Sequence, residues 1–163
     1  MANAVTHIIL TIVIIDIFRD YFIKKKFPTW IVLAGGIAGL LPDIDLPFTW
    51  LYNFVNKTAL NFHGGLTHSI IIPIIFLLIG LFIWYKHGKR NTRILFFAIA
   101  FGWAFHLLLD CMFGGYSSLL FPFYAGNFCP EFNIQRYAAG IDAVILVLWL
   151  LHEEIMHEIK DYI

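Results

Sequence analysis

Residues 94–112 read ILFFAIAFGWAFHLLLDCM, and the single Asp, Glu, Lys or Arg among them is Asp110. A helix needs about 20 mostly apolar residues to cross the hydrocarbon core of a bilayer. Residues 66–85 form a second stretch of comparable length. Hydrophobic residues make up 60% of the 163-residue chain and charged residues 13%, whereas soluble domains carry about 25% charged residues. The sequence therefore predicts an integral membrane protein.

Three shorter apolar segments accompany these two. Because neither repeats nor linker-like compositions divide the chain, we expect residues 1–163 to form a single domain. The expected fold is all-α, with about five transmembrane helices in one compact bundle. These helices are expected to run roughly from Ala4 to Phe18, Pro28 to Leu41, Leu66 to Tyr85, Ile94 to Met112 and Ala138 to Leu151.

The distribution of lysine and arginine predicts the orientation in the membrane. Loops 19–26 and 86–93 carry four basic residues each, while loops 42–65 and 110–137 carry one each. Cytoplasmic loops are enriched in Lys and Arg. We therefore expect a multi-pass protein of the cell membrane, with both basic loops and the C-terminus in the cytoplasm and the other loops outside.

The charge balance excludes one class of partner. Eleven basic and eleven acidic residues give a formal net charge of zero, so no basic excess attracts nucleic acid. Ionisable residues at membrane depth are costly and mark functional sites. Three groups of such residues stand at the ends of the apolar segments.

The first group ends the second segment, in Leu41-Pro42-Asp43-Ile44-Asp45. Pro42 interrupts the helix, and in an extended turn Asp43 and Asp45 point to the same side. Two carboxylates this close repel each other unless a cation or a proton lies between them. The alternative is a solvated loop at the end of a helix.

The second and third groups contain histidine. His63 and His68 flank a Gly64-Gly65 turn, and His106 stands four residues before Asp110, a spacing that places both side chains on one helix face. Imidazole and carboxylate are the usual ligands of zinc and similar divalent metals. The alternatives are capping or interfacial histidines and a structural His–Asp hydrogen bond.

The predicted orientation brings these groups to the outer side, together with His7 from the first segment. The seven donors suffice for one or two divalent ions, zinc first, with manganese, iron or magnesium as alternatives. His87, His152 and His157 fall on the inner side and are interpreted as solvated residues. The predicted ligands are His7, Asp43, Asp45, His63, His68, His106 and Asp110.

The two cysteines, Cys111 and Cys129, both fall in the fourth loop, which is expected outside. A disulfide between them would suit an oxidising compartment. Two buried thiols remain the alternative.

The motifs resemble those of the YdjM-like membrane-bound metal-dependent hydrolases. That family pattern combines an early His, a G-x-L-L-P-D-x-D segment end, an H-R-G-x-T-H-S turn and an H-x-x-x-D helix followed by W-P or F-P. This chain has His7, residues 39–45, residues 63–69, and residues 102–124 with Phe121-Pro122. Gly64 stands where the family often has Arg. The resemblance implies a metal-dependent hydrolase in the membrane.

We therefore expect a metal-activated water to attack an ester, favouring a phosphoester, of a lipid or lipid-linked molecule at the outer face. Asp45 is the candidate general base. Arg136 is the candidate for binding an anionic headgroup, and Asp142 for orienting a ligand histidine; the alternative for both is an interfacial ion pair. The expected partner is this lipid or lipid-linked substrate, and the sequence identifies no particular protein partner.

Two other classes of function use the same cluster. A metal-binding or transport protein would need a polar route to the inner side, and the first segment offers little beyond Thr11 and Asp16. A structural metal would only hold the helices together. The one-sided placement of the donors favours an enzyme.

Overall fold

The computed structural model describes residues 4–60, 63–114, 119–124, 129 and 138–157, and this part of the chain is all-helical. Three short helical turns join the main helices: η1 (Phe18–Phe22), η2 (Leu41–Ile44) and η3 (Leu66–His68). The α-helices are α1 (Ala4–Ile17), α2 (Thr29–Ala38), α3 (Asp45–Asn56), α4 (Ile71–Tyr85), α5 (Arg90–Gly114) and α6 (Ala138–His157).

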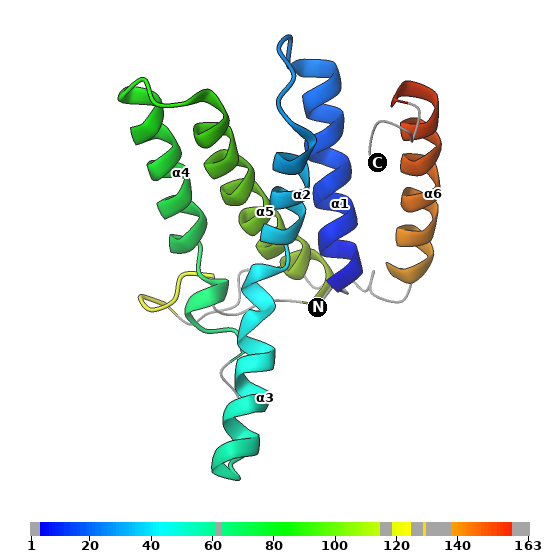
Figure 1. Cartoon of the computed structure of the whole chain (residues 1–163). Helices are drawn as coiled ribbons and strands as arrows, with labels where there is room; N and C mark the ends of the chain where they lie inside the picture. Colours follow the sequence, from blue (N-terminus) through cyan, green and yellow to red (C-terminus); the bar gives the residue numbers. More distant parts are fainter. Residues whose placement is uncertain (1–3, 61–62, 115–118, 125–128, 130–137, 158–163) are drawn as a thin grey trace.

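Figure 1 shows α3 projecting from one end of a bundle in which α1, α2, α4, α5 and α6 stand side by side. Helix α5 packs between α4 and α2, α2 packs on α1, and α1 packs on α6. Helices α2 and α5 approach closely where glycines face each other, because a Cβ on Gly102 would collide with the carbonyl oxygen of Gly35. The core beside this contact contains the buried side chains of Ile15, Ile31 and Ala98.

The helix lengths agree with only part of the predicted bundle of five transmembrane helices. Residues Arg90–Phe113 of α5 are long and apolar enough to cross a membrane. Helices α2 and α3 pass the same test only together, as a broken span or a re-entrant loop bent by 51° at residues 39–40, and Ile71–Tyr85 is a shorter apolar helix. Among the described residues there are six α-helices rather than five, because α3 occupies the region 42–65 that was expected to be a loop.

The expected helix from Leu66 to Tyr85 is also interrupted. Gly64 has a φ of 89°, which favours glycine. The 3-10 turn η3 follows, and Ser69 is extended with a ψ of 141°. Helix α4 therefore begins at Ile71, and His68 lies in a separate turn at the end of the bundle.

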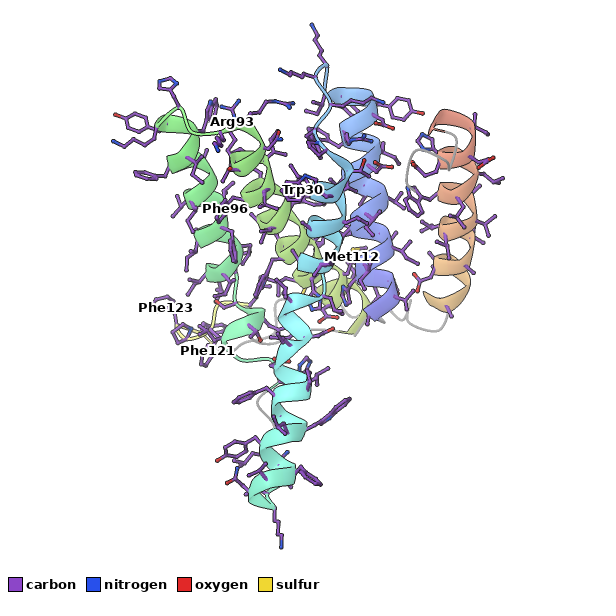
Figure 2. The ribbon with its side chains drawn as sticks, in the orientation of Figure 1. Trp30, Arg93, Phe96, Met112, Phe121 and Phe123 are labelled. Carbon is purple, nitrogen blue, oxygen red and sulfur yellow. A yellow bond between two sulfur atoms is a disulfide. The ribbon has the colours of Figure 1, made fainter. Side chains whose placement is uncertain are left out.

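The two basic loops lie together at the opposite end. The Arg90 guanidinium of one loop donates hydrogen bonds to the carbonyl oxygens of Lys25 and Lys26 in the other. Figure 2 shows Arg93 at this end, and Phe121 and Phe123 at the end where η2 and η3 lie. The fold thus separates the basic residues from the predicted metal ligands.

Candidate metal centre

Four elements bring histidine and aspartate together at the η2–η3 end of the bundle. His7 comes from α1, Asp43 from η2, His68 from η3, and His106 and Asp110 from α5. His7, His68 and His106 are fully buried and Asp110 is 1% exposed, while the Asp43 side chain is 16% exposed. Asp43, His68, His106 and Asp110 each offer a ligand atom within 4.8 Å of the others. We call these five residues the candidate centre.

His106 is oriented by the helix packed against it. Its Nδ1 lies 2.7 Å from the carbonyl oxygen of Gly39, and since a carbonyl can only accept, Nδ1 carries the proton. The Nε2 lone pair then faces Oδ2 of Asp110 at 3.3 Å and Oδ1 of Asp43 at 3.6 Å. A ring nitrogen that faces two carboxylates is satisfied by a cation or a proton between them.

His7 completes the centre from α1. Its ring stacks on that of His106 with a centroid distance of 3.8 Å, and its Nε2 lies 3.4 Å from Oδ1 of Asp110. Within the described part of the chain, neither nitrogen of His7 nor Nε2 of His106 has a hydrogen-bond partner. Because buried polar atoms without partners are costly, this donor set fits a divalent ion.

Asp45 lies beside the centre and faces a different set of groups. Its Oδ1 lies 2.8 Å from Nδ1 of His63, and its Oδ2 accepts hydrogen bonds from the Gly64 amide at 3.2 Å and the Thr67 hydroxyl at 2.8 Å. Asp45, His63 and His68 form a second group whose ligand atoms lie within 4.8 Å of one another.

His68 belongs to both groups through its two ring nitrogens. Nδ1 lies 3.1 Å from Oγ1 of Thr67 and 3.3 Å from Oδ2 of Asp45. Because the Thr67 hydroxyl donates to Asp45, it accepts from Nδ1, and Nε2 turns toward Asp43 at 3.5 Å and Asp110 at 3.9 Å. A carboxylate that orients a ligand histidine in this way is common around metals.

The expectation that Asp43 and Asp45 point to one side is wrong. Leu41–Ile44 form a 3-10 turn and Asp45 begins α3, so the backbone is helical instead of extended. Residues i and i+2 of a helical turn do not face each other. Asp43 therefore faces Nε2 of His68 and of His106, while Asp45 faces His63, Thr67 and the opposite nitrogen of His68, Nδ1.

Two predicted residues remain, Arg136 and Asp142. Arg136 lies outside the described residues. Oδ2 of Asp142, which is 6% exposed, accepts a hydrogen bond of 2.6 Å from the hydroxyl of Thr6. Asp142 therefore contacts the residue preceding His7 on α1, and this bond joins α6 to α1.

A third His–carboxylate cluster was missed from the sequence. Asp16, His152 and Glu153 have ligand atoms within 4.8 Å of one another, between the ends of α1 and α6 that lie away from the candidate centre. Nε1 of Trp149 donates to Asp16 at 3.3 Å, and the Tyr21 hydroxyl lies 3.2 Å from Nε2 of His152. His152 is half-buried here, which corrects its interpretation as a solvated residue. The sequence feature that could have revealed this cluster is Asp16, because an acid inside an apolar segment marks a candidate functional site.

The cysteines form a disulfide between Cys111 and Cys129, with Cα atoms 4.9 Å apart. This resolves the choice between a disulfide and two thiols. Since Cys111 follows Asp110 directly, the bond ties residue 129 to α5 beside the candidate centre.

The comparison with protein families bears out the resemblance. The sequence model described as YdjM inner membrane protein matches residues 1–160. No curated protein and no solved structure gives a significant match. This chain, with its buried His/Asp centre, belongs to the YdjM inner membrane protein family, known as a family of membrane-bound metal-dependent hydrolases.

Proposed function

We propose that this protein hydrolyses an ester, favouring a phosphoester, of a lipid or lipid-linked molecule at the outer face of the membrane. The observation that carries the proposal is the position of His106, whose Nδ1 is held by Gly39 while its Nε2 faces Asp110 and Asp43. Bound there, a divalent metal would polarise a substrate oxygen and lower the pKa of a coordinated water.

The residues of the chain have distinct roles in this proposal. His7, Asp43, His68, His106 and Asp110 hold one ion, and the mixture of imidazole and carboxylate suits zinc, with manganese, iron or magnesium as alternatives. A second ion held by Asp45 and His63 could share His68 only if Nδ1 of His68 lost the proton that it donates to Thr67.

The contacts of Asp45 favour a positioning role over that of a general base. Both of its oxygens face donors, in His63, Gly64 and Thr67. A carboxylate engaged in this way orients His68 and has little remaining capacity to take a proton from water.

Two observations support an outer location for the site. The basic loops, which the positive-inside rule places in the cytoplasm, lie at the other end of the bundle (Figures 1 and 2). The disulfide between Cys111 and Cys129 lies beside the candidate centre, and disulfides persist in oxidising compartments.

The apolar core argues against a transport route through the bundle. Ile15, Ile31, Val32 and Ala98 are buried between the candidate centre and the basic loops. Along α1, an ion leaving the centre toward the other side would meet only the buried hydroxyl of Thr11 before it reached the Asp16 cluster, which is too few polar ligands for a continuous route. The structure therefore favours hydrolysis over transport.

The test compares His106→Asn with His87→Asn. An Asn side-chain amide can keep the hydrogen bond to Gly39 but removes the Nε2 lone pair. His87 is exposed on the α4–α5 turn, and its φ of 52° is one that Asn tolerates.

Metal content of the purified protein and metal-dependent hydrolysis of phospholipids and polyprenyl phosphates are measured for both variants. We expect His106→Asn to lose both metal and activity and His87→Asn to keep both. Full metal content in His106→Asn would overturn the site, and a metal-loaded protein inert toward every ester would overturn hydrolysis in favour of metal binding alone.

A further inference from the structure

A cavity of about 360 Å³ lies between α1 and α5, and every residue that lines it is apolar. Its lining includes Ile14 of α1, Phe18 of η1 and Phe27, together with Ile94, Phe97 and Phe101 of α5. An apolar cavity offers no hydrogen bonds to ordered water. We call it the α1–α5 groove.

The groove and the candidate centre share their two helices. The stacked rings of His7 and His106 hold α1 and α5 together at the centre. Phe101 precedes His106 by five residues, which is about 7.5 Å along a helix, and Ile94 precedes it by twelve, about 18 Å. The groove therefore begins about one and a half turns from the ligands and extends away from them.

Apolar side chains also connect the α1–α5 groove with the candidate centre. Phe101 stacks on Phe105 at 5.5 Å between ring centroids. Phe105 and Leu10 pack on the cluster of Leu109 and Phe113, and Leu109 is the neighbour of Asp110 in the chain. A long hydrocarbon chain can thus follow apolar surface from the candidate centre into the groove.

We propose that the α1–α5 groove binds an acyl chain of the lipid substrate while its ester lies at the candidate centre; this inference rests on the proposed function. Ile14 and Phe101, at 37% and 38% exposure, open the groove sideways, where a chain of an inner membrane protein family meets lipid. The apolar lining excludes a sugar or a second charged group from the same space. The lining accordingly favours a lipid with a long hydrocarbon chain, here an acyl lipid, over a water-soluble ester.

The test fills the groove with Ile14→Trp and uses Ile17→Trp as the matched control. Ile17 lies on the same helix at 41% exposure, but it does not line the groove. Detergent-purified protein is loaded with dioleoyl phosphatidic acid, and bound lipid is counted by native mass spectrometry. We expect Ile14→Trp to lower lipid occupancy about tenfold, as displacing about two methylenes would, and Ile17→Trp to match the wild type.

Equal lipid occupancy in the two variants, or no retained lipid in the wild type, would overturn the proposal that the groove binds an acyl chain. If Ile14→Trp does not fold, Phe101→Ala, which removes a wall, is compared with Leu108→Ala on the exposed side of α5. Occupancy should then fall in Phe101→Ala alone, and equal occupancy in these two would again overturn the groove.

Lipid occupancy does not require hydrolysis, so the two proposals fail separately. His106→Asn should retain lipid while losing activity. If lipid binding depends on Ile14 but the protein hydrolyses no ester, the proposal for the groove stands and the proposal of a hydrolase is overturned. If the protein hydrolyses short and long acyl esters alike, and Ile14→Trp does not change this, the proposal of a hydrolase stands and the proposal for the groove is overturned.

Discussion

Nδ1 of His106 donates a hydrogen bond to the carbonyl oxygen of Gly39 at 2.7 Å. This one bond joins the end of α2 to α5 and turns Nε2 of His106 toward Asp110 and Asp43. The absence of a side chain on Gly39 lets this end of α2 pack closely against α1. A Cβ there would lie 2.8 Å from Oγ1 of Thr11 and 3.1 Å from the carbonyl oxygen of His7.

Gly39→Ala should therefore disturb stability and metal binding together. The added methyl group must displace α1 or α2, at a cost of about 1–3 kcal/mol, and the Gly39 carbonyl moves away from His106. Gly140→Ala on α6 is the control, because a Cβ there meets nothing within 4 Å; its stability should stay unchanged or rise by up to about 1 kcal/mol. Thermal unfolding in detergent and metal content check both, and normal metal content in Gly39→Ala would contradict the role given to this carbonyl.

Asp45→Asn should weaken the binding of a metal without abolishing it. Its carboxylate orients His68 from outside the candidate centre, and the loss of such a partner typically costs about 10–100-fold in metal affinity. Asp43→Asn, which alters a residue of the centre itself, should have the larger effect. Competition with a chromogenic chelator measures both affinities, and the role of Asp45 would be wrong if the two variants lost metal equally.

Thr6→Val should loosen the contact between α1 and α6. It removes the hydroxyl that donates to Asp142 at 2.6 Å and leaves a buried carboxylate with a lost hydrogen bond, which costs about 1–3 kcal/mol. Thr11→Val is the matched control, since Thr11 is equally buried but its hydroxyl bonds only to the His7 carbonyl of its own helix. The unfolding midpoint should fall clearly for Thr6→Val alone; equal midpoints would show that this bond does not hold α6.

The side of the membrane is testable at the two ends of the bundle. Lys57 ends α3, beyond the candidate centre, and Lys89 lies in a basic loop. We expect Lys57→Cys to react with an impermeant maleimide in intact cells, and Lys89→Cys to react only after permeabilisation, because basic loops stay in the cytoplasm. The opposite labelling pattern would place the centre on the inner side.

The sequence predicted contacts within the candidate centre mainly for residues that share one helix. His106 and Asp110 are four residues apart on α5, and that spacing places them on one face whatever surrounds them. The placement of Asp43 and Asp45 was wrong because η2 and α3 are helical where an extended turn was assumed. That choice depends on packing against α5 and η3, which local sequence does not specify.

Composition and periodicity by themselves determined that this chain is helical, apolar and charge-poor, because burial in lipid demands apolar residues and internally hydrogen-bonded helices. The family motifs likewise identified the residue types of the centre. Only the tertiary structure decided which oxygen faces which nitrogen, that His68 joins two groups, that Cys111 bonds Cys129, and that Asp16 meets His152 and Glu153. These contacts join residues far apart in the sequence, and their distances depend on how closely the helices pack.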